Sequence, residues 1–195
     1  MWLLSLAALA APPALSSLKA GDYGGILVTV DPAGHLIAGR FDQATVGNGT
    51  EASPQFTCRF AFYAPLADAP SAPVEVWMDA KRSAGVLTAV DAASFDLQLD
   101  EQPGGCWNVD PAAGALDKGA RFQLDAGSTA PALPFRVVSA EKAFFYSKID
   151  GPPRAAYVVA GDVVTVLAAQ EQWVEVSYGA TKGWLRVADL RPLPK

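Results

Sequence analysis

Apolar and polar residues alternate with period two in several short runs, as in strands that have one buried and one wet face. The clearest run lies at residues 56–62, and residues 74–78 and 95–100 repeat its alternation. Phe56, Cys58, Phe60 and Phe62 share one face of the first run, and Thr57, Arg59 and Ala61 share the other. These runs predict strands, and the four-residue face predicts part of a core.

Further short runs fill the region between residues 21 and 132. Asp31-Pro32-Ala33-Gly34 is a turn sequence between residues 26–30 and 35–41, which predicts a hairpin. The other strand-like runs are residues 55–63, 74–78, 85–90, 95–100, 106–109 and 121–124. Seven or eight strands without a convincing helix predict an all-β fold, an antiparallel β-sandwich or barrel at residues 21–132.

Five short apolar runs lie between residues 143 and 190. Residues 163–167 are rich in β-branched side chains, and residues 173–178 alternate with period two. A Gly-Asp turn at residues 161–162 and Gly179 separate neighbouring runs. Five short strands in about 50 residues would bury little apolar surface as one open sheet. They therefore predict a small barrel.

This stretch resembles the bacterial SH3-like (SH3b) family. The resemblance rests on the aromatic start at residues 144–146, on Tyr157-Val158-Val159-Ala160-Gly161-Asp162, on Trp173-Val174-Glu175-Val176, and on Gly183-Trp184-Leu185 with Asp189-Leu190. It implies a small SH3-like β-barrel at residues 135–195 that binds cell-wall peptides or other proteins, or makes only structural contacts, and it does not imply catalysis. Residues 128–134 are expected to form a short linker.

The N-terminus reads as a secretory signal peptide. An apolar run covers residues 1–11, is too short to span a bilayer, and is followed by small-x-small sites, so residues 1–20 are assigned to the signal. The run lacks a preceding Lys or Arg, and the alternative is an N-terminal helix or strand of the mature protein. We therefore expect a periplasmic or secreted protein without a stable membrane span.

The charge is uneven along the chain. Residues 1–134 hold seven Lys or Arg and fourteen Asp or Glu, a net charge of −7, and residues 135–195 hold eight and six, a net charge of +2. An acidic body repels phosphate backbones, so no nucleic acid is expected as a partner. It could attract a basic partner, or it could be an ordinary solvated surface.

Cys58 and Cys106 are the only cysteines, and His35 is the only histidine. In an exported chain the two cysteines are expected to form a disulfide, which would stabilise the fold by about 4 kcal/mol. A metal site needs more ligands, and a cysteine nucleophile needs a base. We therefore expect no metal, no cofactor and no catalytic residues.

His35 and a set of carboxylates are the remaining candidates for chemistry. His35 follows the Gly34 turn and reads as a surface histidine, because no hydrolase, metalloprotease or nucleotide-binding motif accompanies it. The carboxylates Asp96, Asp100 and Glu101 could serve a glycosidase only across a defined gap. They read more simply as the wet face of a strand.

The aromatic residues of the C-terminal stretch predict a ligand site. Phe145 and Trp184 are expected to fill the small core. The candidates for ligand contact are Tyr146, Tyr157, Trp173 and Tyr178, which carry polar groups and could border the loop at residues 147–154.

These observations predict an exported, non-enzymatic binding protein of the cell envelope, with an envelope protein or a peptidoglycan peptide as partner. The first domain, through its Phe-x-Cys-x-Phe strand, its Gly-Gly-Cys and its acidity, resembles small periplasmic lysozyme-inhibitor barrels. That resemblance implies an alternative, inhibition of or immunity to a basic wall hydrolase. The remaining alternatives are a wall hydrolase targeted by its SH3b domain and a purely structural role.

Overall fold

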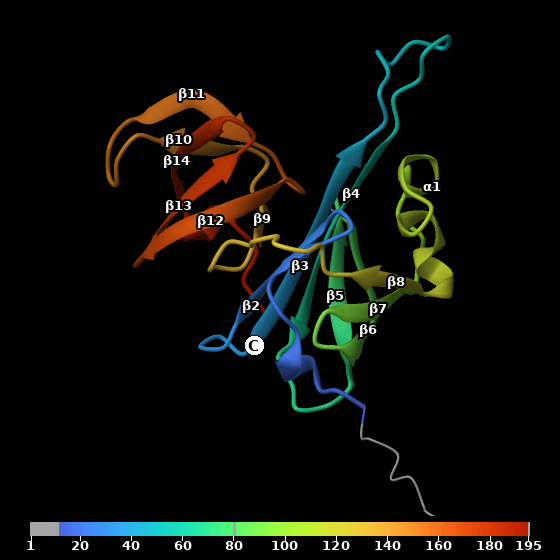
Figure 1. The fold of residues 1–195 in the computed structure, drawn as a ribbon. Helices are drawn as coiled ribbons and strands as arrows, with labels where there is room; N and C mark the ends of the chain where they lie inside the picture. The colour runs from blue at the N-terminus through green and yellow to red at the C-terminus, as the bar shows by residue number, and fades with distance from the viewer. Residues whose placement is uncertain (1–11, 80, 195) are drawn as a thin grey trace, which may run out of the picture.

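The computed structural model describes residues 12–79 and 81–194, and its strands form two antiparallel sheets that follow one another along the chain (Figure 1). The strands of the first sheet are β1 (Gly21–Tyr23), β2 (Ile26–Asp31), β3 (Leu36–Ala44), β4 (Thr57–Pro65), β5 (Ser71–Met78), β6 (Lys81–Asp91), β7 (Ser94–Leu99) and β8 (Ala120–Gln123). The strands of the second are β9 (Arg136–Val137), β10 (Ala143–Tyr146), β11 (Pro153–Val158), β12 (Val163–Gln170), β13 (Trp173–Tyr178) and β14 (Thr181–Arg186).

The described part of the chain contains only short helical segments. They are α1 (Cys106–Val109) and the 3₁₀ segments η1 (Leu15–Ser17), η2 (Ala113–Lys118) and η3 (Val187–Asp189). The predicted all-β, antiparallel fold class is thereby confirmed. In residues 12–79 and 81–194, we find no helix of the length and apolarity that a bilayer crossing requires.

The first sheet is an eight-stranded meander, because each strand pairs with the next along the chain. The meander curls into a near-barrel. The backbone N–H of Asp125 donates to the carbonyl oxygen of Asp22 at 2.8 Å and brings the end of the meander back to β1. Side chains at alternate positions along the strands point inward and fill its core, among them Phe41, Phe60 and Phe95. The alternation predicted at residues 58–62 is therefore confirmed as a core face.

The second sheet has the strand order β11-β10-β14-β13-β12-β9 and a smaller core of its own. Phe145, Val176 and Leu185 point into this core, and Phe145 is buried as predicted. Gly183 on β14 lies against the Phe145 side chain and the Tyr146 carbonyl, so a side chain at this position would collide with the carbonyl oxygen and crowd the Phe145 ring. Gly183 thus lets β10 and β14 approach closely.

A third apolar cluster joins the two sheets. Leu36, Ala38, Ala61, Tyr63 and Trp77 face outward from the first sheet and pack against Phe135, Val137 and Val163; we call these eight residues the shared core. The shared core explains why Ala61, which was expected on the wet face of its strand, is fully buried. The two sheets therefore pack against one another over a dry contact.

Three sequence predictions about single elements are wrong. Residues 106–109 form the helical turn α1 and not a strand, and the extra strand lies instead at Gly21–Tyr23. Phe56 is 37% exposed, because β4 begins only at Thr57. Trp184 lies outside the core, because Gly183 and Leu185 are the residues of β14 that point inward.

The N-terminal segment before β1 packs on the first sheet. Residues 1–11 of the predicted signal peptide lie outside the described residues. Leu15 and Leu18 are buried in the core of the near-barrel, and the backbone of Leu15 donates to the carbonyl oxygen of Ala69 at 2.8 Å. A chain that began at Gly21 would therefore lose two core side chains.

Candidate functional site

Strand pairing places five aromatic side chains on one face of the C-terminal sheet. Residues directly opposite one another in an antiparallel pair share a face. Phe144 is opposite Tyr157, Tyr146 is opposite Trp184, and Trp173 is opposite Arg186. The neighbours Phe145, Leu185 and Val174 point to the core. The five rings of Phe144, Tyr146, Tyr157, Trp173 and Trp184, called the aromatic face below, therefore run across β11, β10, β14 and β13.

One end of the aromatic face is a packed group of two rings and a cation. The rings of Tyr146 and Trp173 meet edge to face with centroids 4.8 Å apart. The Arg186 guanidinium lies 5.4 Å from the Tyr146 centroid and 5.6 Å from that of Trp173. Such cation–π contacts stabilise by about 0.5–1 kcal/mol at exposed sites and hold the group in one arrangement.

A hollow of about 640 Å³ opens beside this group. Trp173 and Arg186 form one wall, and Asp150 and Glu171 contribute carboxylates. Both signs of charge thus line the hollow, and the Trp173 ring beside them is only 9% exposed.

The other end of the aromatic face is open to solvent. Phe144 and Tyr157 are 38% and 46% exposed, and their ring centroids are 5.6 Å apart. The Lys142 ammonium lies 5.0 Å from the centroid of the Tyr157 ring. Phe144 and Tyr157 therefore form a small exposed apolar patch.

Tyr178 differs from the other three predicted site residues because it takes part in a partly buried contact. Its hydroxyl donates to Asp162 Oδ1 at 2.7 Å, and Asp162 Oδ2 accepts the Val159 N–H at 2.9 Å. Burial and the hydrogen bond to Asp162 raise the pKa of Tyr178. Structure thus brings Tyr146 and Trp173 together, places Tyr157 at the far end of the same face, and assigns Tyr178 to the contact with the near-barrel.

Arg59 of the near-barrel completes that contact. Its guanidinium lies 3.1 Å from Asp42 Oδ1 and 3.8 Å from Asp162 Oδ1, so it bridges the two sheets. Burial favours the neutral form of Asp42, and the hydrogen bonds and charges of Arg40 and Arg59 outweigh it and lower the pKa of Asp42. Asp42 is therefore held as an anion beside the domain contact.

The polar residues considered for chemistry lie apart from the aromatic face. His35 is exposed at the β2–β3 turn with a φ of 51°. Asp96 forms a two-pronged ion pair with Arg121 at 2.7 and 2.9 Å, and this hydrogen bonding lowers the pKa of Asp96. Residues 12–79 and 81–194 contain no cluster of three or more His, Cys, Asp or Glu that could hold a metal ion.

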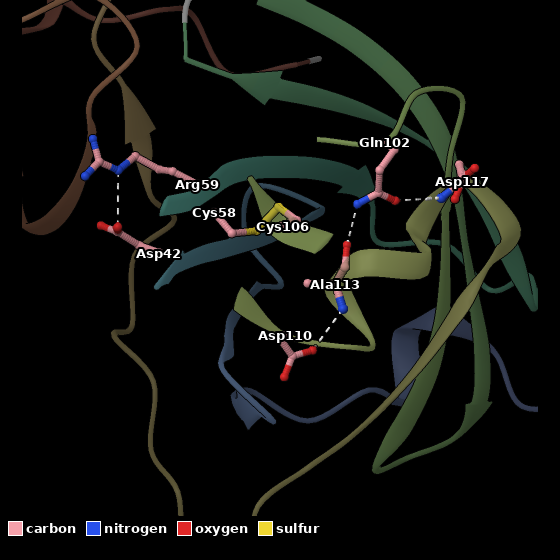
Figure 2. The surroundings of a disulfide bond; sticks show 8 residues. All are labelled: Asp42, Cys58, Arg59, Gln102, Cys106, Asp110, Ala113 and Asp117. Atoms are coloured by element: carbon pink, nitrogen blue, oxygen red, sulfur yellow. Dashed lines mark hydrogen bonds and ion pairs between the residues drawn. A yellow bond between two sulfur atoms is a disulfide. The ribbon is translucent and has the colours of Figure 1, made fainter. Parts of the chain in front are cut away.

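The disulfide attaches the short helical segment that begins at Cys106 to strand β4 of the near-barrel. Cys58 on β4 is bonded to Cys106 at the start of α1, with their Cα atoms 4.4 Å apart, as predicted (Figure 2). Gln102 donates to the Ala113 carbonyl at 2.6 Å, and Asp110 accepts the Ala113 N–H at 2.9 Å (Figure 2). These bonds hold a short helical segment whose Trp107 is 74% exposed.

A long extension of the β3–β4 hairpin rises beside α1. Residues 45–56, called the arm below, project beyond the sheet (Figure 1). Thr45 and Phe56 exchange two hydrogen bonds of 2.9 Å at its base, and Asn48 and Ser53 pair near its tip at 3.1 Å. The arm is therefore shaped by its own hydrogen bonds, and Val46 on it is fully exposed.

Sequence reasoning missed Phe144, Trp184 and Arg186 as members of the candidate site. Phe144 has the same period-two phase as Tyr146, so the sequence held a signal for it. The places of Trp184 and Arg186 depend on the register between β10, β14 and β13, which a single sequence does not reveal.

Comparisons with known proteins bring no match: no protein-family model, no curated protein and no solved structure matches the chain.

Proposed function

We propose that this protein is an exported, non-catalytic binding protein of the cell envelope, and that its C-terminal sheet holds a peptidoglycan peptide on the aromatic face. The observation that carries this proposal is the row of five rings across four adjacent strands, with a cation stacked at each end. The resemblance to the SH3b family supports a binding role. The Cys58–Cys106 disulfide supports a periplasmic or secreted location, because disulfides persist in oxidising compartments.

The chemistry of the face suits a wall peptide. Aromatic rings bury large areas at low entropic cost, and they stack on the apolar faces of sugars and peptide backbones. Stem peptides of peptidoglycan carry carboxylates and amines. Lys142 and Arg186 can bind the former, while Asp150 and Glu171 at the hollow can bind the latter.

Co-sedimentation of the whole chain with insoluble peptidoglycan tests this proposal. Phe144→Ser with Tyr157→Ser removes the exposed end of the face, and we expect the affinity, obtained from the bound fraction across a peptidoglycan titration, to fall about tenfold, equivalent to 1.4 kcal/mol. Leu167→Ser is the matched control, because Leu167 is 40% exposed on β12 and lies outside the aromatic face. A chain that lacks the whole C-terminal sheet would expose the apolar residues of the shared core, so loss of binding by that chain would not be specific to the aromatic face.

Each outcome has a separate meaning. Loss of binding in the double variant with binding retained in the control supports the wall ligand. If the wild-type chain stays in the supernatant, the wall ligand is ruled out, and a protein ligand becomes the leading alternative for the same face.

A second candidate function, inhibition of a basic wall hydrolase, is favoured by the arm. A narrow projection with its own hydrogen bonds can enter an active-site cleft without paying a large ordering entropy. The surrounding near-barrel belongs to the acidic part of the chain, whose net charge of −7 would attract a basic enzyme.

An inhibition assay with a basic muramidase tests the second candidate. We expect Val46→Asp on the arm to abolish inhibition, while Val86→Asp, at an equally apolar exposed position on β6, leaves it intact. Undiminished muramidase activity at saturating wild-type protein would remove this candidate. Clearing of peptidoglycan by the protein alone would instead indicate a hydrolase.

A further inference from the structure

The C-terminal tail, residues 191–194, lies across the outer face of the near-barrel. The Arg191 guanidinium stacks 3.6 Å from the centroid of the Trp77 ring, and Leu193 packs against the shared core. The Arg191 backbone is fixed as well, because its N–H donates to Val137 and its carbonyl accepts from Arg136 at 2.7 Å. Figure 1 marks the C-terminus beside the β2–β3 end of the near-barrel.

The sequence of the tail determines its shape. Pro192 and Pro194 hold φ near −65° and donate no backbone hydrogen bond. The residue before a proline is restricted to extended conformations, which applies to Arg191 and Leu193. The Arg-Pro-Leu-Pro segment therefore docks as an extended, polyproline-like strand.

An open groove of about 950 Å³ continues from the end of the tail. Pro194 lines it together with Tyr63 and Leu36, which also belong to the shared core. Pro65 and Pro73 add further apolar surface. The groove is thus a continuation of the surface on which the tail already lies.

The polar rim of the groove carries charges of both signs. Glu75 is paired with Arg82 and Glu101 with Lys81, and Asp100 forms no ion pair with another described residue. Glu75 also accepts the indole N–H of Trp77 at 2.7 Å and the Arg82 guanidinium at 2.6 Å, which fixes the orientation of the Trp77 ring. A basic side chain of a ligand is complementary to Asp100 on this rim.

We propose that this groove is a second binding site, which takes an extended, proline-containing peptide with a basic residue from a partner protein. The tail shows the chemistry that the adjoining surface accepts: beside the groove, the Arg191 guanidinium lies on Trp77 and Leu193 packs against the shared core. Pro194 lines the groove itself. A polyproline-like peptide loses little entropy on docking and suits an apolar groove. This site is separate from the aromatic face and does not depend on the function proposed for it.

Fluorescence anisotropy with a labelled peptide, Arg-Pro-Leu-Pro repeated twice, tests the proposal on the whole chain. We expect saturable binding that weakens at least tenfold in Ala84→Arg. Ala84 is exposed, lines the groove and lies opposite Glu75, so the new side chain adds bulk and a repelling charge. Gln98→Arg is the control, because Gln98 is exposed on β7 outside the groove.

Two further measurements test whether the groove binds peptides without proline, or a second copy of the chain, in place of the proposed peptide. A peptide with glycine in place of every proline is expected to bind at least tenfold more weakly; equal binding would overturn the polyproline assignment. Light scattering should show a monomer. A concentration-dependent dimer that is lost on deletion of residues 193–195 would assign the groove to a second copy of the chain and overturn the proposal, as would absence of binding by the wild-type chain.

Discussion

The Tyr63 hydroxyl, in the near-barrel, donates a 2.9 Å hydrogen bond to the carbonyl oxygen of Phe135, at the start of the C-terminal part of the chain. Both residues are buried in the shared core, and burial raises the pKa of Tyr63. A satisfied polar pair inside an apolar contact fixes one relative arrangement of its two sides. The two sheets are therefore expected to unfold together.

Tyr63→Phe keeps the ring and removes this hydrogen bond. We expect the free energy of unfolding to fall by about 1–3 kcal/mol, because the carbonyl of Phe135 stays buried without its donor. Urea unfolding followed by fluorescence and by circular dichroism measures the change. Tyr157→Phe, at an exposed position, should have no effect on stability. Two separate transitions in the wild-type chain would contradict joint unfolding.

Asp42 makes stability depend on pH in the acid range. Its pKa is lowered in the folded state, so the stabilisation is fully present above the ordinary value of about 3.9 and is lost as the pH falls through the folded pKa. We expect Asp42→Asn to cost about 1 kcal/mol at pH 7 and progressively less below pH 4. Unfolding curves at pH 7 and pH 3 test this difference.

Glu51→Gln on the exposed arm is the control for Asp42→Asn, and it should leave both curves unchanged. An equal loss of stability from Asp42→Asn at the two pH values would show that the side chain acts through shape and not through charge.

Leu15 should be essential to the near-barrel, although it lies within the segment assigned to the signal peptide. Deletion of a buried leucine side chain leaves a cavity and costs about 2–5 kcal/mol. In a chain that begins at Pro12, we expect Leu15→Ala to lower the unfolding free energy by that amount. A chain that begins at Gly21 should be less stable still, since it lacks Leu18 as well. Equal stability of the chains beginning at residues 12 and 21 would contradict a core role for this segment.

Removal of the disulfide should destabilise the near-barrel and free the segment that carries Trp107. The bond closes a loop with a sequence separation of 48 residues, and its loss through Cys58→Ala with Cys106→Ala should cost up to about 4 kcal/mol. Thermal unfolding of both proteins measures the cost. Reducing agent should lower the stability of the wild-type chain and leave the double variant unaffected.

The strands and their core faces were readable because period-two alternation is a local property. Phe60 and Phe62 were placed in the core from that period alone, and the cysteine count led to the disulfide. The helical turn at Cys106–Val109 was not readable, because four residues hold too little periodicity to separate a turn of helix from a strand.

The candidate site was only partly readable for a different reason. Trp173 and Tyr146 meet through the register of three strands, and Tyr178 is drawn away by Asp162 at the contact between sheets. Both relationships join residues far apart in the sequence, so local patterns do not reveal them. A stretch rich in aromatic residues is equally compatible with a core, a groove and an interface. The groove beside Pro194 has no sequence signal, since it arises only where the tail crosses the near-barrel.

The most direct test of wall-peptide binding on the aromatic face is calorimetric titration of the whole chain with soluble muropeptides released from peptidoglycan. We predict saturable binding by the wild-type chain, affinity at least tenfold weaker in Tyr157→Ala, and unchanged affinity in Leu167→Ala. No heat of binding with the wild-type chain, or equal affinity in Tyr157→Ala and the wild type, would contradict the assignment of this face to a wall peptide.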